Sequence, residues 1–173
     1  MKTIVAIDPG VSGGIAVSAF GKVACFPMLV TEGDRVDFIK SMKAATSQEG
    51  GELVCVLEQV SGYAGKGQPG SAMFVFGENF GFFKGVIQAL EIRLELVRPQ
   101  EWQKGLGLGT ASACGSKPEW KNKLKAEAQR RFPQLHVTHK TADALLIFEW
   151  HRGLPANHAN GREYGAHGVT RPT

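Results

Sequence analysis

The chain has 173 residues, a formal charge of +4 at pH 7 and 43% hydrophobic residues. This length suits one domain with a single hydrophobic core, and the apolar content is that of a globular protein. We assign residues 1–152 to that domain and expect residues 153–173, rich in glycine, histidine, asparagine and proline, to form a flexible tail. The positive charge is compatible with a polyanionic partner.

The cysteines and the hydropathy pattern indicate in which cellular compartment the protein works. Cys25, Cys55 and Cys114 lack the spacing of a metal site, and their odd number predicts reduced thiols and a cytoplasmic location. No apolar run approaches the length of a membrane span. We therefore expect no membrane partner.

The order of short β-branched runs and amphipathic stretches predicts an α/β chain. We expect strands at 3–8, 14–20, 22–28, 53–58 and 93–98. We expect helices at 34–45, 71–90, 118–131 and 141–152, with glycine-containing loops at 61–69 and 105–116. The helix at 71–90 is apolar on more than one face, so part of it packs on the sheet and the rest belongs to the core or to a dimer interface.

Two of the predicted strands end in a carboxylate. Asp8 follows the run Ile4–Ile7 and enters a glycine-rich turn, and Glu58 ends the apolar run that begins at Leu53. If these strands lie side by side, the two acids meet at one edge of the sheet, where a divalent cation or a raised pKa must relieve their repulsion. The alternatives are an ordinary Asp-Pro-Gly turn for Asp8 and a solvated strand end for Glu58.

A third acid, Asp143, lies near the start of the last predicted helix, for which Thr141 or a nearby residue is the expected N-cap. In the first turn of a helix the macrodipole favours an anion. His139 is four residues before Asp143 and shares its helix face if the helix starts early enough. The alternative is a helix-start aspartate satisfied by backbone N–H groups.

The segments Ile7–Gly10, Glu58–Val60 and Ala142–Leu145, in this order and spacing, resemble the RuvC Holliday-junction resolvases. The stretches 76–86 and Arg98–Trp102 resemble more closely the RuvC-like nucleases carried by bacteriophages. The resemblance implies a ribonuclease H-like α/β fold, a five-stranded mixed sheet with helices on both faces. It also implies a homodimeric endonuclease that cuts branched DNA with two magnesium ions, in a bacterial or phage-infected host cell.

The resemblance assigns metal binding and catalysis to Asp8, Glu58 and Asp143. The family carries a carboxylate or histidine three residues before the last aspartate, where this chain has Lys140, so we take His139 as the fourth ligand; an exposed helix-cap histidine is the alternative. Magnesium prefers oxygen ligands, and manganese should substitute because imidazole is softer. In the expected mechanism Asp8 bridges both ions, Glu58 holds one, and Asp143 with His139 holds the other. One ion generates the attacking hydroxide and the other stabilises the leaving 3′ oxygen.

The predicted DNA contacts lie on a basic segment and on the loop 61–69. Lysines of the basic segment would bind phosphates without reading sequence, although charge runs are usually solvated faces. The loop follows Glu58, and in the resembling family it approaches the branch point, where Tyr63 either stacks on bases or packs within the loop. The predicted DNA-binding residues are Tyr63, Lys66, Lys104, Lys117, Lys121, Lys123 and Lys125.

Two other functions are compatible with the sequence. A catalytically weak protein that binds branched DNA is favoured by Lys140 at a ligand position and opposed by the three intact acids. Asp8 and Gly10 with Ser12-Gly13 also resemble the phosphate loop of sugar kinases and actin-like ATPases, but those proteins need two such lobes and this chain supplies one. The sequence does not choose among four-way junctions, three-way forks and flaps.

Overall fold

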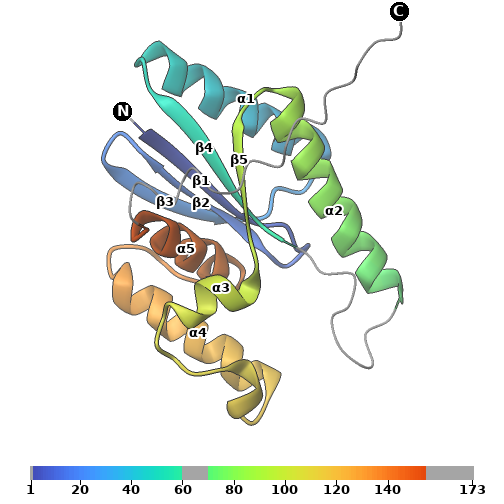
Figure 1. Ribbon diagram of the computed structural model, residues 1–173, viewed down its shortest axis with the longest axis vertical. Coiled ribbons are helices and arrows are strands. Elements are labelled where there is room, and N and C mark those ends of the chain that lie inside the picture. Colours follow the sequence, from blue (N-terminus) through green and yellow to red (C-terminus); the bar gives the residue numbers. More distant parts are fainter. Residues whose placement is uncertain (1, 60–69, 155–173) are drawn as a thin grey trace, which may run out of the picture.

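The computed structural model describes residues 2–59 and 70–154. A five-stranded mixed sheet forms its centre, with the spatial order β3-β2-β1-β4-β5 (Figure 1). The strands are β1 (Lys2–Asp8), β2 (Gly14–Ala19), β3 (Lys22–Pro27), β4 (Glu52–Glu58) and β5 (Arg93–Val97). β1, β2 and β3 form antiparallel pairs, whereas β1, β4 and β5 run parallel.

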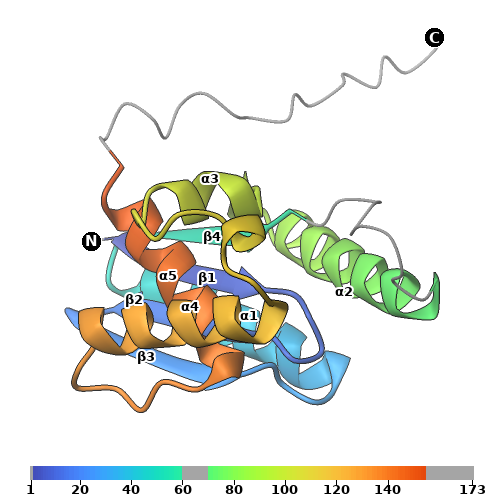
Figure 2. The same cartoon turned by 90° about the horizontal axis from the view of Figure 1, so that it is seen from below.

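Helices cover both faces of this sheet (Figures 1 and 2). They are α1 (Glu32–Gln48), α2 (Gly70–Ala89), α3 (Pro99–Lys104), α4 (Lys117–Arg131) and α5 (His139–Arg152), with a short 3-10 turn at Ala111–Ala113. One hydrophobic layer joins the sheet to α1 and α2, and the other joins it to α3, α4 and α5. The predicted α/β class, with a mixed sheet between helices, is therefore confirmed.

The alternation of side chains along the strands decides on which face the two strand-end acids lie. Ala6 of β1 and Val56 of β4 belong to the layer beneath α5. Because successive strand residues point to opposite faces, Asp8 and Glu58 continue the rows of Ala6 and Val56. β1 and β4 are parallel neighbours. Both acids therefore lie at the same edge of the sheet and face α5.

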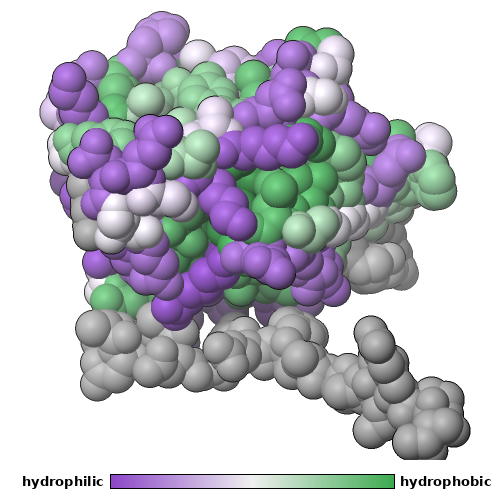
Figure 3. All heavy atoms as spheres, turned by 90° about the horizontal axis from the view of Figure 1, so that it is seen from above, coloured by the Kyte–Doolittle hydropathy of each residue, from purple (hydrophilic) through white to green (hydrophobic). Residues whose placement is uncertain are grey.

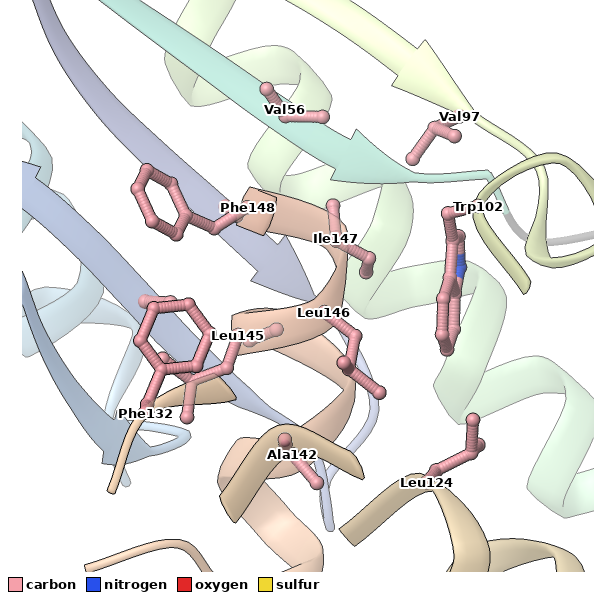
Figure 4. Packing of buried hydrophobic residues seen from close by; sticks show 14 of the residues in the cluster. Val56, Val97, Trp102, Leu124, Phe132, Ala142, Leu145, Leu146, Ile147 and Phe148 are labelled. Atoms are coloured by element: carbon pink, nitrogen blue, oxygen red, sulfur yellow. The ribbon is translucent and has the colours of Figure 1, made fainter. Parts of the chain in front are cut away.

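Helix α5 is buried over most of its length, from Thr141 to Phe148. It lies against β1, β2 and β3 on one side and against α4 on the other. A helix enclosed in this way has to be apolar nearly all round, which explains the run Ala144–Phe148. Figure 4 shows the resulting core, in which side chains of α5 meet those of α4, α3 and the sheet.

The start of α5 differs from the expectation. The helix begins at His139, and Thr138 is its N-cap. Of the expected N-caps, Thr141 or a residue near it, the nearby Thr138 is thus the observed one. The hydroxyl of Thr141 is already inside the helix and accepts a hydrogen bond of 3.0 Å from the backbone N–H of Thr138. Asp143 consequently lies in the second turn, where the helix dipole is a weaker influence than in the first.

Helix α3 is an element that the sequence pattern did not predict. It has only six residues, too few to show a hydrophobic period. Pro99 occupies its first turn, and the carboxylate of Glu101 accepts a hydrogen bond of 3.0 Å from the backbone N–H of Arg98. These local contacts start the helix directly after β5.

The N-terminal part of α2 extends past the sheet (Figure 1). Asn79, Phe83 and Ile87 are its buried residues, whereas Phe74 is 71% exposed and Val75 is 39% exposed. Of the two expected uses of this apolar helix, core packing is thus observed for its C-terminal part. None of the helices within residues 2–59 and 70–154 is both long and apolar enough to cross a membrane.

A close backbone approach joins α5 to the antiparallel strands. A Cβ atom at Gly14 would lie 2.4 Å from the carbonyl oxygen of Lys140 and 2.8 Å from that of Phe26. Only glycine avoids this clash. Gly14 stands opposite Asp8 in the register of β1 and β2. The contact therefore brings the first turn of α5 to the end of β1, with Asp143 one turn further on.

We predict that Gly14→Ala destabilises the protein by about 1–3 kcal/mol, because two backbone carbonyls would have to move. Gly33→Ala is the matched control, since its Cβ would meet only the hydroxyl of Thr31, at 3.7 Å. Within helix α1 that change should be neutral or stabilising by up to about 1 kcal/mol. Urea unfolding measures both, and equal effects would contradict the close approach.

Candidate metal centre

Asp8, Glu58 and Asp143 meet at the edge of the sheet where β1 and β4 end. Glu58 is 7% exposed and Asp143 4%, and Asp8 is half-buried. Burial, and then the negative charge of Asp143, raises the pKa of Asp8 to about 6. Burial, and then the charges of Asp8 and Asp143, raises the pKa of Glu58 to about 8. The structure thus brings together the three acids that the sequence singled out.

Neutral N–H groups hold one oxygen of each strand-end acid. The backbone N–H of Gly10 donates to Oδ1 of Asp8 at 3.1 Å, within the turn after β1. The indole N–H of Trp102, on α3, donates to Oε1 of Glu58 at 2.9 Å. Both contacts oppose the rise in pKa, because they stabilise the ionised carboxylates. They also fix the direction in which each carboxylate points.

Lys121 of α4 forms an ion pair with Oδ2 of Asp143. Burial alone would lower the pKa of Lys121, but Asp143, followed by Asp8 and Glu58, raises it above its usual value. The sequence analysis expected Lys121 on a surface that faces DNA phosphates. The structure instead directs its ammonium group toward the acids, where one positive charge partly offsets their mutual repulsion.

The donor set fits a divalent metal ion. Oδ1 of Asp143 is buried and has no hydrogen-bond partner, so it presents an unsatisfied anionic oxygen. A Cβ at Gly13 would lie 2.7 Å from Cγ of Asp8, so only glycine leaves that carboxylate in place. Carboxylate oxygens are the ligands that magnesium prefers. As they stand, no three His, Cys, Asp or Glu side chains in the described ranges are close enough to one another to form a metal-ligand group.

His139 lies apart from the three acids. Its Nε2 shares a hydrogen bond of 2.8 Å with Oδ1 of Asn122 on α4, and both side chains are exposed. α5 does start early enough to carry His139 and Asp143 four residues apart, but the imidazole is directed toward α4. Lys140 is also exposed. A role for His139 as fourth ligand would require it to release Asn122.

The predicted DNA contacts that the structure describes lie on α3 and α4. Lys104, Lys117 and Lys123 are exposed, and Lys125 is half-buried. The ammonium of Lys123 donates to the carbonyl of Leu108 at 3.3 Å and so connects α4 to the preceding glycine loop. Two predicted contacts, Tyr63 and Lys66, lie outside the described residues together with the loop 61–69, and so does the tail from 155 onward.

The sequence analysis did not predict that two residues, Trp102 and Lys121, contact the acids. Trp102 appeared only as part of a motif, because nothing local indicates that an indole five residues after β5 contacts the end of β4. Lys121 appeared as one of several lysines in a basic helix. Its position between the buried Trp120 and Leu124 was the available signal, since it places Lys121 near the inner face of α4.

The strand order, the helices on both faces and the acid-bearing helix α5 define a ribonuclease H-like fold of the RuvC type. Among solved structures, the chain is similar to "T. thermophilus RuvC in complex with Holliday junction substrate", with a TM-score of 0.53, 15% identity, and coverage of 88% of this chain and 93% of that one. It is also similar to "Thermus thermophilus RuvC structure", with a TM-score of 0.51, 16% identity, and coverage of 87% and 93%. No protein-family model and no curated protein matches the sequence. At these identities the likeness establishes the fold.

We predict that the metal-free protein loses stability as the pH rises from roughly 5 to roughly 8. The folded-state pKa values, about 6 for Asp8 and about 8 for Glu58, exceed the ordinary values of 3.8 and 4.5. In this window the folded state therefore binds more protons than the unfolded state, and stability falls as those protons are removed. Thermal unfolding in a chelator, at a series of pH values, measures the slope.

The control for this measurement is Glu58→Gln, whose amide does not titrate. It should flatten the dependence of melting temperature on pH, most of all between pH values of about 6 and about 8. Excess magnesium should raise the melting temperature of the wild type most at the high-pH end, because the metal binds the ionised acids. Equal slopes for the wild type and Glu58→Gln would contradict the buried position of this acid.

Proposed function

We propose that this protein is a metal-dependent endonuclease that cuts branched DNA, a Holliday-junction resolvase of the type carried by bacteriophages. The observation that carries the proposal is the meeting of Asp8, Glu58 and Asp143 on a RuvC-type fold. One of the similar structures is RuvC with a Holliday junction substrate. The proposal places the protein in the cytoplasm of a bacterial or phage-infected cell.

In this proposal Asp8, Glu58 and Asp143 hold two magnesium ions, with His139 as a fourth ligand once it releases Asn122. Magnesium bound there would supply a hydroxide from water and stabilise the leaving 3′ oxygen. The chain's own groups keep the acids oriented, through the N–H groups of Gly10 and Trp102. Because the acids as they stand do not form a metal-ligand group, a bound ion would have to draw their carboxylates closer together.

Lys121 has a second task in the proposed reaction. A scissile phosphate that approaches three carboxylates is repelled by them, and the interaction is strong because the site is partly dry. The ammonium group of Lys121 lies at Asp143 and adds a positive charge at this place. It therefore favours the approach of the phosphate, while the exposed lysines of α3 and α4 contact the flanking DNA backbone.

A homodimer completes the proposal, because two opposed strands of a four-way junction require two active sites related by a two-fold axis. The exposed Phe74 and Val75, on the part of α2 that extends past the sheet, are candidate contacts. Figure 3 shows a further apolar area, framed by hydrophilic side chains, on the side that carries α1 and the C-terminal end of α2. These are apolar surfaces that a second copy would cover.

We predict that the wild type cuts a labelled four-way junction only when magnesium, or manganese in its place, is present. Asp8→Asn, Glu58→Gln and Asp143→Asn should each lose at least ~100-fold in cleavage and still bind the junction, because each removes a metal ligand and little shape. A dimer should produce paired cuts in opposed strands. Comparing the cleavage rates of forks, flaps and four-way junctions in the same assay would show which branched substrate is preferred.

Each alternative function has its own outcome in this assay. Tight junction binding without magnesium-dependent cutting would favour the catalytically weak DNA-binding protein. Hydrolysis of a nucleoside triphosphate without DNA cleavage would favour the phosphate-binding domain of the sugar-kinase type. Single cuts that are not paired, at all protein concentrations, would contradict the homodimer but would still support a metal-dependent nuclease.

We predict that His139→Ala lowers magnesium-dependent cutting by at least about 10-fold, because it removes a metal ligand. Asn122→Ala is the matched control, since it breaks the same hydrogen bond and leaves the imidazole. It should cut as well as the wild type or better. Manganese should partly rescue His139→Asp, and Lys140→Ala should lower only DNA affinity. Equal losses in His139→Ala and Asn122→Ala would show that His139 acts through its surface contact.

We predict that replacing Lys117 and Lys123 by Gln weakens binding to all DNA shapes about equally. The slope of log affinity against log salt should shrink by about one to two units, because each lost phosphate contact releases fewer condensed cations. The control replaces the exposed Lys22 and Lys40, on β3 and α1, and should leave the slope unchanged. Loss of junction binding alone, with normal binding to linear duplex, would show that α4 reads branch shape.

A further inference from the structure

The three acids share a pattern of hydrogen bonding. One oxygen of each is held by a group of the chain: Oδ1 of Asp8 by a backbone N–H, Oε1 of Glu58 by an indole N–H, and Oδ2 of Asp143 by an ammonium. Within residues 2–59 and 70–154, no hydrogen bond is found for the second oxygen of any of them. Among the described residues, each acid therefore has one oxygen fixed by a donor and one that no donor holds.

Glu58 differs from the other two acids in its donor, which is a neutral side chain and not a backbone N–H or an ammonium group. The indole of Trp102 is fully buried, and its N–H is its single polar group, directed at Oε1 of Glu58 at 2.9 Å. A glutamate side chain has three rotatable bonds, so a carboxylate at the end of β4 has many orientations open to it. The indole contact selects one of these orientations.

The donor and the acceptor are both held by rigid surroundings. The backbone N–H of Gln59 donates to the carbonyl of Val97 at 2.7 Å, which joins β4 and β5 where α3 departs. The indole ring belongs to the hydrophobic cluster formed by α3, α4, α5 and the sheet (Figure 4). At the other end of α3, a Cβ at Gly105 would lie 3.2 Å from the ring of Trp150 on α5. The position of the indole is thus fixed by the β4–β5 contact before α3, by the surrounding hydrophobic cluster and by the packing of Gly105 against Trp150.

We propose that Trp102 is the positioning residue that turns the second oxygen of Glu58 toward a bound metal ion. This inference rests on the proposed function of the site as a metal centre. The indole is neutral, so it orients the carboxylate and leaves its negative charge for the cation, which a lysine at the same place would cancel. Partners of this kind, which act through a metal ligand, typically change metal affinity by about 10–100-fold.

The test compares Trp102→Phe with Trp120→Phe. Both replace a buried indole of the same hydrophobic cluster by a smaller ring, but only the first removes a donor to Glu58. In titration calorimetry with magnesium alone, and again with manganese alone, Trp102→Phe should bind at least about 10-fold more weakly than the wild type. Trp120→Phe should bind like the wild type. Equal affinities for the two variants would overturn the inference.

A double-variant cycle separates orientation from packing. In the Glu58→Gln background, Trp102→Phe should cause little further loss of metal affinity, because the oriented ligand is already gone. Full additivity of the two losses would assign Trp102 to packing alone and overturn the inference. If the wild type itself binds neither magnesium nor manganese, the proposed function fails, and that outcome is read from the wild type without any variant.

Nuclear magnetic resonance provides a measurement that does not depend on the folding of Trp102→Phe. The protein has three tryptophans, and Trp120→Phe and Trp150→Phe identify two of the three indole N–H signals by their disappearance. The remaining signal, from Trp102, should shift when magnesium is added to the wild type and should also differ in Glu58→Gln. A Trp102 signal that moves in neither case would overturn the inference.

Discussion

The repulsion among three carboxylates gathered at one buried place is the constraint on which this structure depends. Burial of Asp8 and Glu58, and then the like charges beside them, disfavours their ionised forms, which raises the pKa of Asp8 to about 6 and that of Glu58 to about 8. A fold selected for stability alone would not gather them. Their presence, held by Gly10, Trp102 and Lys121, is typical of a site that binds cations.

Much of the architecture serves to keep these acids in place. Parallel pairing of β1 and β4 puts Asp8 and Glu58 at one edge, and the alternation of side chains puts them on one face. The glycine at 14 lets the start of α5 approach the antiparallel strands, which brings Asp143 to the same edge. Because α5 is buried between the sheet and α4, the helix cannot move Asp143 away from the other two acids. Stability in the core offsets the strain at the site.

Helix α4 combines two functions on its two sides. Its inner side packs on α5 and carries Lys121 to Asp143, while its outer side presents Lys117 and Lys123 to solvent. The similarity to RuvC, at 15–16% identity, covers most of the chain but establishes only the fold. Function has to be argued from the site, because one fold supports several chemistries. Here the acid set and its donors carry that argument.

The sequence alone predicted the fold class, the sheet strands and four of the five α-helices that the structure describes, because each of these elements is a run of residues long enough to be recognised locally. It also singled out Asp8 and Glu58, because an acid that ends an apolar run is visible in the chain itself, and Asp143 from its place near the start of the last helix. It did not predict α3, whose six residues are too short to show a period, nor the start of α5, where two threonines offer similar caps.

Only the tertiary structure decided which side chains reach the acids. The contacts of Trp102 with Glu58 and of Lys121 with Asp143 join residues 44 and 22 positions apart. The pairing of His139 with Asn122 likewise depends on how α4 lies on α5. Such contacts follow from the packing of elements against one another, and no local pattern of residues encodes them. The acids can therefore be found from the sequence, whereas the groups that orient them and offset their charge can be found only from the tertiary structure.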